Sequence, residues 1–201
     1  MYHLNALDRV MQWDRQLFAL INDRGSASFL DMVLPFLRES QLWVPFYLFM
    51  ILFMTINFKK MGWWWVLAFV LTAALADIIS SHIIKENIMR MRPCRDPLLS
   101  AEVIFRVNYC PKSSSFTSSH ATSHFALSMF IWRTLRRVSK WWGMIFLWAF
   151  AICYTQVYVG VHYPLDVICG GLLGCGIGAF MAYMYARQIG LIIFDKTTLR
   201  S

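Results

Sequence analysis

Long apolar runs with very few charges dominate the pattern of the chain. Four runs carry at most two Asp, Glu, Lys, Arg or His side chains each: Gln41–Phe58, Met61–Ile84, Trp141–Val161 and Pro164–Ala186. A helix needs about 20 residues to cross the roughly 30 Å hydrocarbon core of a bilayer, and these runs are long enough to do so. The pattern therefore predicts membrane-spanning helices.

A fifth run, Ser113–Trp132, has no formal charge, but its first half reads SSSFTSSHATSH and is strongly polar. Side chains that face lipid must therefore come from Phe125 onward. Polar groups at membrane depth need a protein interior or a water-filled cavity. We expect this segment to enter the membrane beside a polar site.

The N-terminal residues combine apolar positions at helical spacing with interrupting charges, and they lack the basic leader of a cleavable signal. The apolar positions are Leu4, Leu7, Met11, Leu17, Phe18 and Ile21, and the charges are Asp8, Arg9, Asp14 and Arg15. This spacing predicts an amphipathic helix lying in the membrane interface. A helix packed on another part of the protein is the alternative.

These elements predict an all-α fold, an integral membrane bundle of about five transmembrane helices preceded by the amphipathic interfacial helix. No internal repeat or second domain is visible, so residues 1–201 are expected to form a single membrane-embedded domain. Within it we expect an interfacial segment at 1–40, a transmembrane core at 41–186 and an active-site loop at 85–117.

Composition supports this class. Hydrophobic residues make up 58% of the 201 positions and charged residues only 15%, and the mean hydropathy is +0.50. A soluble domain of this size could not bury so much apolar surface. The net charge of +8 fits anionic lipid or a phosphate-bearing substrate better than nucleic acid in such a chain.

Basic residues and tryptophans indicate an orientation. Lys59 and Lys60 precede three tryptophans, and further tryptophans bracket the basic stretch 133–140. The tryptophans that form this predicted aromatic belt are Trp63, Trp64, Trp65, Trp132, Trp141 and Trp142. We assign that side to the cytoplasm, which places the loop 85–117 on the periplasmic or outer face of a bacterial inner membrane.

Two of the five cysteines, Cys94 and Cys110, fall in the 85–117 loop. In an oxidising compartment they could form a disulfide that closes a loop of about 15 residues, a constraint typically worth about 3 kcal/mol. Two unpaired thiols are the alternative on sequence alone.

Chemically capable residues gather in three segments, each where a span meets the proposed outer face. Lys85–Pro93 (KENIMRMRP) offers cations suited to a phosphate, or to lipid headgroups. Ser113–His124 carries His120 and His124 one helical turn apart, at a helix start whose N–H groups favour anions. A polar helix entry is the alternative for this second segment.

The third segment runs from His162 to Asp166 at the start of the last span. A carboxylate four residues after a histidine can accept one imidazole N–H and leave the other ring nitrogen as a nucleophile or base. The spacing alone is common. Its position at a membrane boundary, where ionisable groups are costly without a role, favours function.

Taken together, the three segments resemble the signature of the type 2 phosphatidic acid phosphatase superfamily, a membrane group related to vanadium haloperoxidases. Lys85 and Arg92-Pro93 match its first motif in full. Ser118 and His120 match the second motif, Pro-Ser-Gly-His, and His162 and Asp166 match the third. By motif the resemblance covers residues 85–166.

The resemblance implies a metal-free phosphohydrolase with no cofactor and a phosphohistidine intermediate. By position His162 is the nucleophile, Asp166 orients it and His120 protonates the leaving oxygen. The resemblance also implies a set of groups that hold the phosphoryl oxygens: Lys85, Arg92, Ser118, the backbone near Ser119, and Gln156. Such a set agrees with what phosphoryl transfer requires, an aligned nucleophile, an acid and positive or N–H charge around the equatorial oxygens.

Three positions depart from the family pattern. Thr117 stands for the proline and Ser119 for the glycine of the second motif, and Thr155-Gln156 stand for Ser-Arg in the third. Gln156 can donate one hydrogen bond but supplies no charge. Losing a cation at a phosphoryl site costs orders of magnitude in rate unless another cation compensates, for which Arg90 and Arg95 are candidates.

A phosphorylated membrane lipid is the expected partner, together with the bilayer itself. Undecaprenyl diphosphate ranks first by family analogy, and phosphatidylglycerol phosphate, phosphatidic acid and lipid A are alternatives. A non-catalytic membrane protein that binds phospholipid headgroups is the alternative of another class. The sequence does not specify an oligomeric state, and no nucleic acid is expected.

Overall fold

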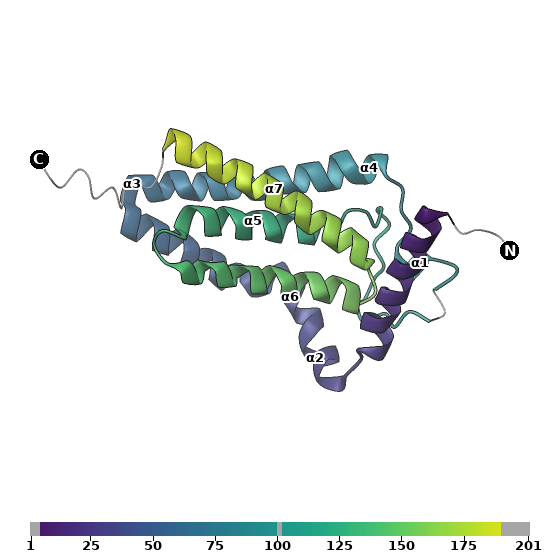
Figure 1. The fold of residues 1–201 in the computed structure, drawn as a ribbon. Coiled ribbons are helices and arrows are strands. Elements are labelled where there is room, and N and C mark those ends of the chain that lie inside the picture. The colour runs from purple at the N-terminus through teal and green to yellow at the C-terminus, as the bar shows by residue number, and fades with distance from the viewer. Residues whose placement is uncertain (1–4, 100–101, 190–201) are drawn as a thin grey trace, which may run out of the picture.

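The computed structural model describes residues 5–99 and 102–189, and every regular element in that part of the chain is helical. Figure 1 shows the arrangement. The helices are α1 Ala6–Ala19, α2 Ser28–Leu37, α3 Val44–Asp77, α4 Lys85–Asn87, α5 Ser119–Leu135, α6 Ile145–Tyr158 and α7 Pro164–Gln188. Shorter helical turns are η1 Leu20–Arg24, η2 Ser40–Trp43, η3 Ile78–Ile84, η4 Pro93–Arg95 and η5 Lys140–Met144. The predicted all-helical class is confirmed.

The predicted domain 1–201 and its segments 1–40 and 85–117 each include residues that lie outside the described part of the chain. Those residues are 1–4, 100–101 and 190–201.

The first two predicted spans form one long element, α3, which turns back on itself (Figure 1). The backbone leaves helical geometry only at Lys59, where φ is 49° and ψ is −121°. At Gly62 the backbones of the two arms lie in direct contact, because a Cβ there would lie 2.0 Å from the carbonyl oxygen of Met54. The basic pair Lys59-Lys60 thus marks the turn between two antiparallel arms.

Two helical segments in the described chain are long and apolar enough to cross a membrane. They are Ser40–Asn87, which contains the turn at Lys59, and Pro164–Gln188. The α5 and α6 helices are shorter, with 17 and 14 residues. The count of about five spans therefore stays a prediction.

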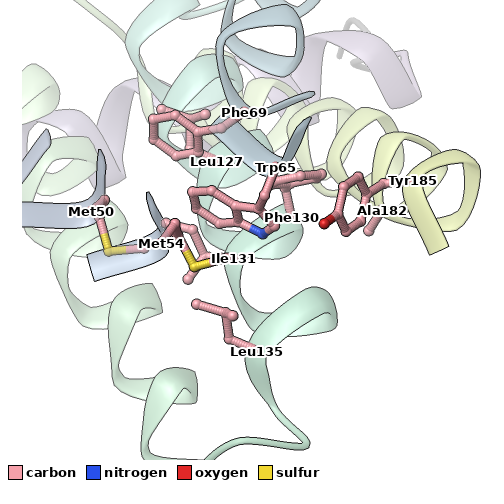
Figure 2. Close-up of a cluster of buried hydrophobic side chains, with 10 residues drawn as sticks. All are labelled: Met50, Met54, Trp65, Phe69, Leu127, Phe130, Ile131, Leu135, Ala182 and Tyr185. Carbon is pink, nitrogen blue, oxygen red and sulfur yellow. The ribbon is translucent and has the colours of Figure 1, made fainter. Parts of the chain in front are cut away.

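An aromatic core fills the bundle between α3, α5 and α7 (Figure 2). Trp65 lies at its centre, with its ring 5.2 Å from that of Phe69 and 5.3 Å from that of Phe130. The Trp65 indole N–H is satisfied by donating to Thr134 Oγ1 at 2.9 Å. The assignment of Trp65 to an interfacial belt is therefore wrong, whereas Trp63 and Trp64 are exposed as a belt requires.

The N-terminal helix α1 lies across one end of the bundle, next to the start of α7 (Figure 1). One face of it is buried on the protein through Asp14 and Phe18. The opposite face exposes Leu7 and Trp13. The helix thus packs on the bundle, as the alternative interpretation predicts. Its placement in a membrane interface stays a prediction.

The α5 and α7 helices approach each other most closely, through a stripe of small residues. Gly174 and Gly178 sit against the α5 backbone, and a Cβ at these positions would lie 2.2 Å from Thr122 O and 2.1 Å from Ala126 O. The last span therefore packs closely on α5 at these glycines. Because both helices begin at the same end of the bundle, the stripe brings their first turns together.

The glycine stripe generates a stability prediction with an internal control. Replacing Gly174 by alanine puts a methyl group into the Thr122 backbone and should cost about 1–3 kcal/mol through forced separation of the helices. Gly176→Ala is the matched control, since nothing lies within 4 Å of its Cβ position. Thermal unfolding in detergent should give a lower Tm for Gly174→Ala and an unchanged or higher Tm for Gly176→Ala. Equal Tm values for the two variants would contradict the packing role.

Candidate active site

Residues 88–92 and 113–118, which lie between α4 and α5 in the chain, form one side of the site. Cys94 and Cys110 are joined by a disulfide, so the alternative of two free thiols is excluded. Ser115 N–H donates to Arg90 O at 2.8 Å, and Arg90 N–H donates to Ser114 Oγ at 3.1 Å. These bonds hold residues 88–92 beside residues 113–115.

His162 lies in the short turn between α6 and α7 and is 2% exposed. Its backbone N–H donates to Gln156 O at 3.2 Å, so the end of α6 fixes the position of the turn. Tyr163 precedes Pro164, which occupies the first turn of α7, where a missing N–H is tolerated. The sequence thus holds the imidazole at the point where the last helix begins.

Arg92 defines the protonation of the His162 ring. Its Nη1 lies 3.0 Å from His162 Nε2, and since a guanidinium can only donate, Nε2 accepts and Nδ1 carries the proton. Burial lowers the pKa of His162 to about 4, and the Arg92 charge acts in the same direction. At neutral pH the ring is therefore neutral, with a lone pair on Nε2.

The Arg92 guanidinium uses all of its N–H groups. Besides His162, it donates to Val161 O at 2.9 Å, to Ser113 O at 3.0 Å, to Ser113 Oγ at 3.1 Å and to Ser114 O at 3.2 Å. Burial lowers its pKa to about 10. An anion can therefore gain a bond from Arg92 only when one of these contacts changes.

Asp166 sits behind His162, but its contact with the ring is longer than a hydrogen bond, at 3.6 Å between Oδ2 and Nδ1. Oδ2 instead accepts from Ser115 Oγ at 2.5 Å and from Tyr163 N–H at 2.9 Å. Ser115 Oγ also lies 3.4 Å from His162 Nδ1. Ser115, which the sequence analysis did not single out, thus links the carboxylate to the imidazole.

Arg90 holds the other side of the Asp166 carboxylate. Its Nη1 lies 2.5 Å from Asp166 Oδ1, and its Nη2 lies 2.5 Å from Asp14 Oδ2. Both carboxylates are fully buried, and the guanidinium stacks over the Tyr163 ring at 4.4 Å. Asp14 also accepts from Leu165 N–H at 2.8 Å. Hydrogen bonds and ion pairs through Asp14 therefore connect the N-terminal helix to the start of α7.

The start of α5 supplies the hydroxyl-rich side of the site. Ser118 is the N-cap, and its backbone N–H donates to Asp166 O at 3.1 Å. Lys85 Nζ donates to Ser119 Oγ at 2.7 Å. The same Ser119 oxygen lies 2.9 Å from Ser81 Oγ. The predicted contacts from Lys85, Ser118 and Ser119 thus converge on one end of α5.

His120 follows directly, on the first turn of α5, and is half-buried. Its carbonyl oxygen lies 2.7 Å from His124 Nδ1, and the two rings are parallel with their centroids 6.2 Å apart. The Trp148 ring packs edge-on against the His124 ring, with the two centroids 4.8 Å apart. Within residues 5–99 and 102–189 the His120 ring has no hydrogen bond, which leaves it available to a substrate.

Gln156 is fully buried on α6, and neither its Oε1 nor its Nε2 has a hydrogen-bond partner in the described chain. Buried amides are nearly always paired, so an unpaired one at this place is unusual. Its backbone carbonyl accepts the His162 N–H, so the residue adjoins the turn that carries the imidazole. The amide can donate to or accept from a ligand without breaking an existing bond.

The two cations considered as replacements for the motif arginine differ in their surroundings. Both amino nitrogens of Arg90 are committed to Asp14 and Asp166. Arg95 is exposed and donates to Cys110 O at 3.4 Å. Arg90 therefore acts on the carboxylate behind the nucleophile and is not free to replace the motif arginine, whereas Arg95 lines a cavity together with Arg92 and its role stays a prediction.

The site combines a neutral, oriented imidazole, a second histidine without a partner, and cations at Lys85 and Arg92. This set can support nucleophilic attack on an anionic centre and protonation of a leaving group. Among the described residues, no three His, Cys, Asp or Glu side chains lie close enough to share a metal ion.

Comparison with known proteins gives a consistent result. The PAP2 superfamily model matches residues 63–189. The lipid A 4'-phosphatase of Bacteroides thetaiotaomicron is 30% identical over 179 residues, 88% of this chain and 78% of that protein. The undecaprenyl-diphosphatase of Sulfolobus acidocaldarius is 30% identical over 168 residues, 81% of this chain and 73% of that protein.

Solved structures agree on the fold. The crystal structure of Aquifex aeolicus LpxE superposes with a TM-score of 0.63 at 26% identity, covering 84% of this chain and 93% of that one. A PAP2-type phosphatidylglycerolphosphate phosphatase from Bacillus subtilis gives 0.57 at 22% identity, covering 94% and 90%.

The burial of His162 predicts its titration. Its pKa of about 4 lies below the ordinary 6.5, so the ring stays neutral as the pH falls through 6 and gains a proton only near 4. NMR of protein carrying ¹³Cε1-labelled histidine should show one signal, absent in His162→Ala, that does not move between pH 5.5 and 8. A midpoint near 6.5 for that signal would contradict the buried, neutral ring.

Asp14 provides a test of the buried charge network. Asp14→Asn keeps the shape but leaves Arg90 with one carboxylate, which should cost about 3–5 kcal/mol of unfolding free energy. Asp23→Asn is the control, because Asp23 is exposed and should change stability by about 0.5 kcal/mol at most. Denaturant unfolding in detergent measures both. A loss below about 1 kcal/mol for Asp14→Asn would mean that the pair is not coupled to the fold.

Proposed function

This chain belongs to the PAP2 superfamily of membrane lipid phosphatases, and we propose that it acts through a covalent phosphohistidine at His162. The observation that carries the proposal is the ring itself, buried and neutral with its Nε2 lone pair facing the Arg92 guanidinium. A nucleophile needs such a lone pair, and a phosphoryl group needs such a cation beside it.

In the first step, His162 Nε2 attacks the phosphorus and the bond to the lipid oxygen breaks. His120, which the negative phosphoryl group beside it holds in the protonated form, gives its proton to that oxygen, which leaves as an alcohol or, from a diphosphate, as a monophosphate. Lys85, Arg92 and the N–H groups at the start of α5 stabilise the charge on the equatorial oxygens. Asp166 and Ser115 balance the positive charge that develops on the imidazole.

In the second step, a water molecule attacks the phosphorus and the N–P bond breaks. His120, now neutral, accepts the proton from that water. The products are inorganic phosphate and a neutral His162, and the enzyme returns to its starting state. The chemistry requires no metal ion, since the cations of the chain carry the charge.

Arg92 controls access to the nucleophile. Its Nη1–H is shared with His162 Nε2 when no substrate is bound. We expect an arriving phosphoryl oxygen to take over this hydrogen bond, which frees the lone pair at the moment when the phosphorus arrives. The Arg92 N–H that occupies the His162 lone pair in the free enzyme would then bind the substrate instead.

The location of the site favours a lipid substrate whose phosphate lies at headgroup level while its tail stays in the bilayer. All the proposed groups lie at the end of the bundle where α5 and α7 begin. The basic turn at Lys59-Lys60 lies at the other end. With that end in the cytoplasm, the site opens to the periplasmic or outer face of a bacterial inner membrane.

Two substrates rank first within this class. Undecaprenyl diphosphate is favoured by the sequence analysis and by similarity to an undecaprenyl-diphosphatase. A lipid A 4'-phosphate is favoured by similarity to a lipid A 4'-phosphatase over most of the chain. Phosphatidylglycerol phosphate and phosphatidic acid complete the set to be compared.

The deciding experiment is phosphate release by purified protein in detergent and EDTA, with each of these four lipids in turn. His162→Ala should lower kcat at least about 10³-fold, because it removes the nucleophile. His82→Ala is the matched control, since His82 is exposed and pairs only with Glu86 in the described chain.

Equal turnover of wild type and His162→Ala would overturn the histidine mechanism. No release from any of the four lipids by folded wild-type protein would favour the alternative of a non-catalytic protein that binds phospholipid headgroups.

A further inference from the structure

Arg38, at the end of α2, is a half-buried arginine without a counter-ion. Its Nε is buried and has no hydrogen-bond partner, and its guanidinium makes no ion pair in the described part of the chain. Its one close aromatic neighbour is Tyr109, with the ring centroid 5.9 Å from the guanidinium carbon. A partly buried charge without a counter-ion is stabilised when an anion completes it.

A continuous series of contacts places the end of α2 beside the predicted acid. Trp43 Nε1 donates to Leu37 O at 2.8 Å, which fixes the residue before Arg38. The Trp43 ring lies 5.5 Å from that of Trp148, and Trp148 lies 4.8 Å from His124. His124 in turn stacks with His120. Arg38 is thus held on the His120 side of the site.

Gln156 lies on α6, the helix that also carries Trp148. Trp148 and Gln156 are eight residues apart, so they lie on one face of that helix, two turns from each other. α2 packs against α6. The unpaired atoms of the described chain include Arg38 Nε, Trp148 Nε1 and both amide atoms of Gln156. Unsatisfied polar groups at the end of α2 and on α6, which pack against each other, fit a polar ligand rather than a packed core.

Arg38 also acts on Arg92 through space. Besides burial, the positive charges of Arg38 and Arg95 lower the pKa of Arg92, while Asp166 and Tyr109 raise it. Two guanidinium groups that repel each other across a site are stabilised when an anion lies between them. Arg92 faces this anion from the His162 side and Arg38 from the α2 side.

We propose that Arg38 binds a non-bridging phosphoryl oxygen of the substrate and supplies the positive charge that Gln156, in the place of the motif arginine, cannot supply. The proposal rests on the function proposed above and adds a substrate-binding residue from outside the three motifs. Gln156 then donates its amide N–H to the same phosphoryl group. The ligand class is a phosphate or terminal diphosphate group carrying at least one negative charge.

The test is a charge-swap between the two positions. Arg38→Met should lower kcat/KM about 10²–10³-fold, as expected for loss of a group that stabilises charge in the transition state. Arg38→Met with Gln156→Arg should recover at least tenfold of that loss, because the arginine returns to its motif position. Arg24→Met is the matched control, an exposed arginine near the same end of the bundle whose loss removes an equal charge.

Binding of orthovanadate, a phosphate analogue, provides a readout that does not need turnover. Vanadate should raise the Tm of the wild type and of Arg24→Met, and should raise that of Arg38→Met much less. If Arg38→Met does not fold, Arg38→Lys replaces it. Lysine keeps the charge but loses the planar fork, so we expect a smaller Tm increase than in the wild type.

The outcomes separate the two proposals. Wild-type kcat/KM and vanadate binding in the Arg38 variants would overturn the role of Arg38 and leave the phosphatase mechanism intact. A wild type that binds vanadate through Arg38 but hydrolyses none of the lipids would retain the anion site and overturn the proposed function. An Arg38→Met loss that Gln156→Arg does not rescue would mean that the two positions do not serve one phosphoryl group.

Discussion

The backbone contact between α5 and α7 is the constraint on which the site depends. At Gly174 and Gly178 the two backbones touch directly, because carbonyl oxygens of α5 occupy the space that a Cβ would need. The two first turns are therefore in register, and Ser118 N–H reaches Asp166 O. His120 and His162 come to the same end of the bundle as a consequence.

The second requirement is charge balance in a buried setting. Asp14, Arg90 and Asp166 form a series of alternating charges, and each carboxylate is held by at least one further backbone N–H group. Their cost of burial is thereby offset. Arg92 is balanced differently, by neutral acceptors and the imidazole. Arg38 and Gln156 remain without partners among the described residues, and this imbalance is what an anionic substrate would correct.

The sequence was sufficient for the features that depend on local pattern. Uncharged runs predict the helices, and the spacing of Lys85, Arg92, His120, His162 and Asp166 predicts a shared site, because each lies at the edge of a predicted span. The contacts that complete the site join residues far apart in the chain. The Arg90–Asp14 and Arg90–Asp166 pairs each span 76 positions, and the Ser115–Asp166 bond spans 51. No periodicity encodes such pairs. The burial of Trp65 was also missed, since it follows from how the arms of α3 pack rather than from local composition.

In the proposed mechanism, His162 forms a bond to phosphorus during turnover. The direct measurement is a rapid alkaline quench of enzyme turning over ³²P-labelled lipid, followed by peptide mapping. The phosphohistidine mechanism predicts an alkali-stable, acid-labile phosphate on the peptide that contains His162, and none in His162→Ala. Label on a different residue, or full turnover with no protein-bound phosphate in either enzyme, would contradict it.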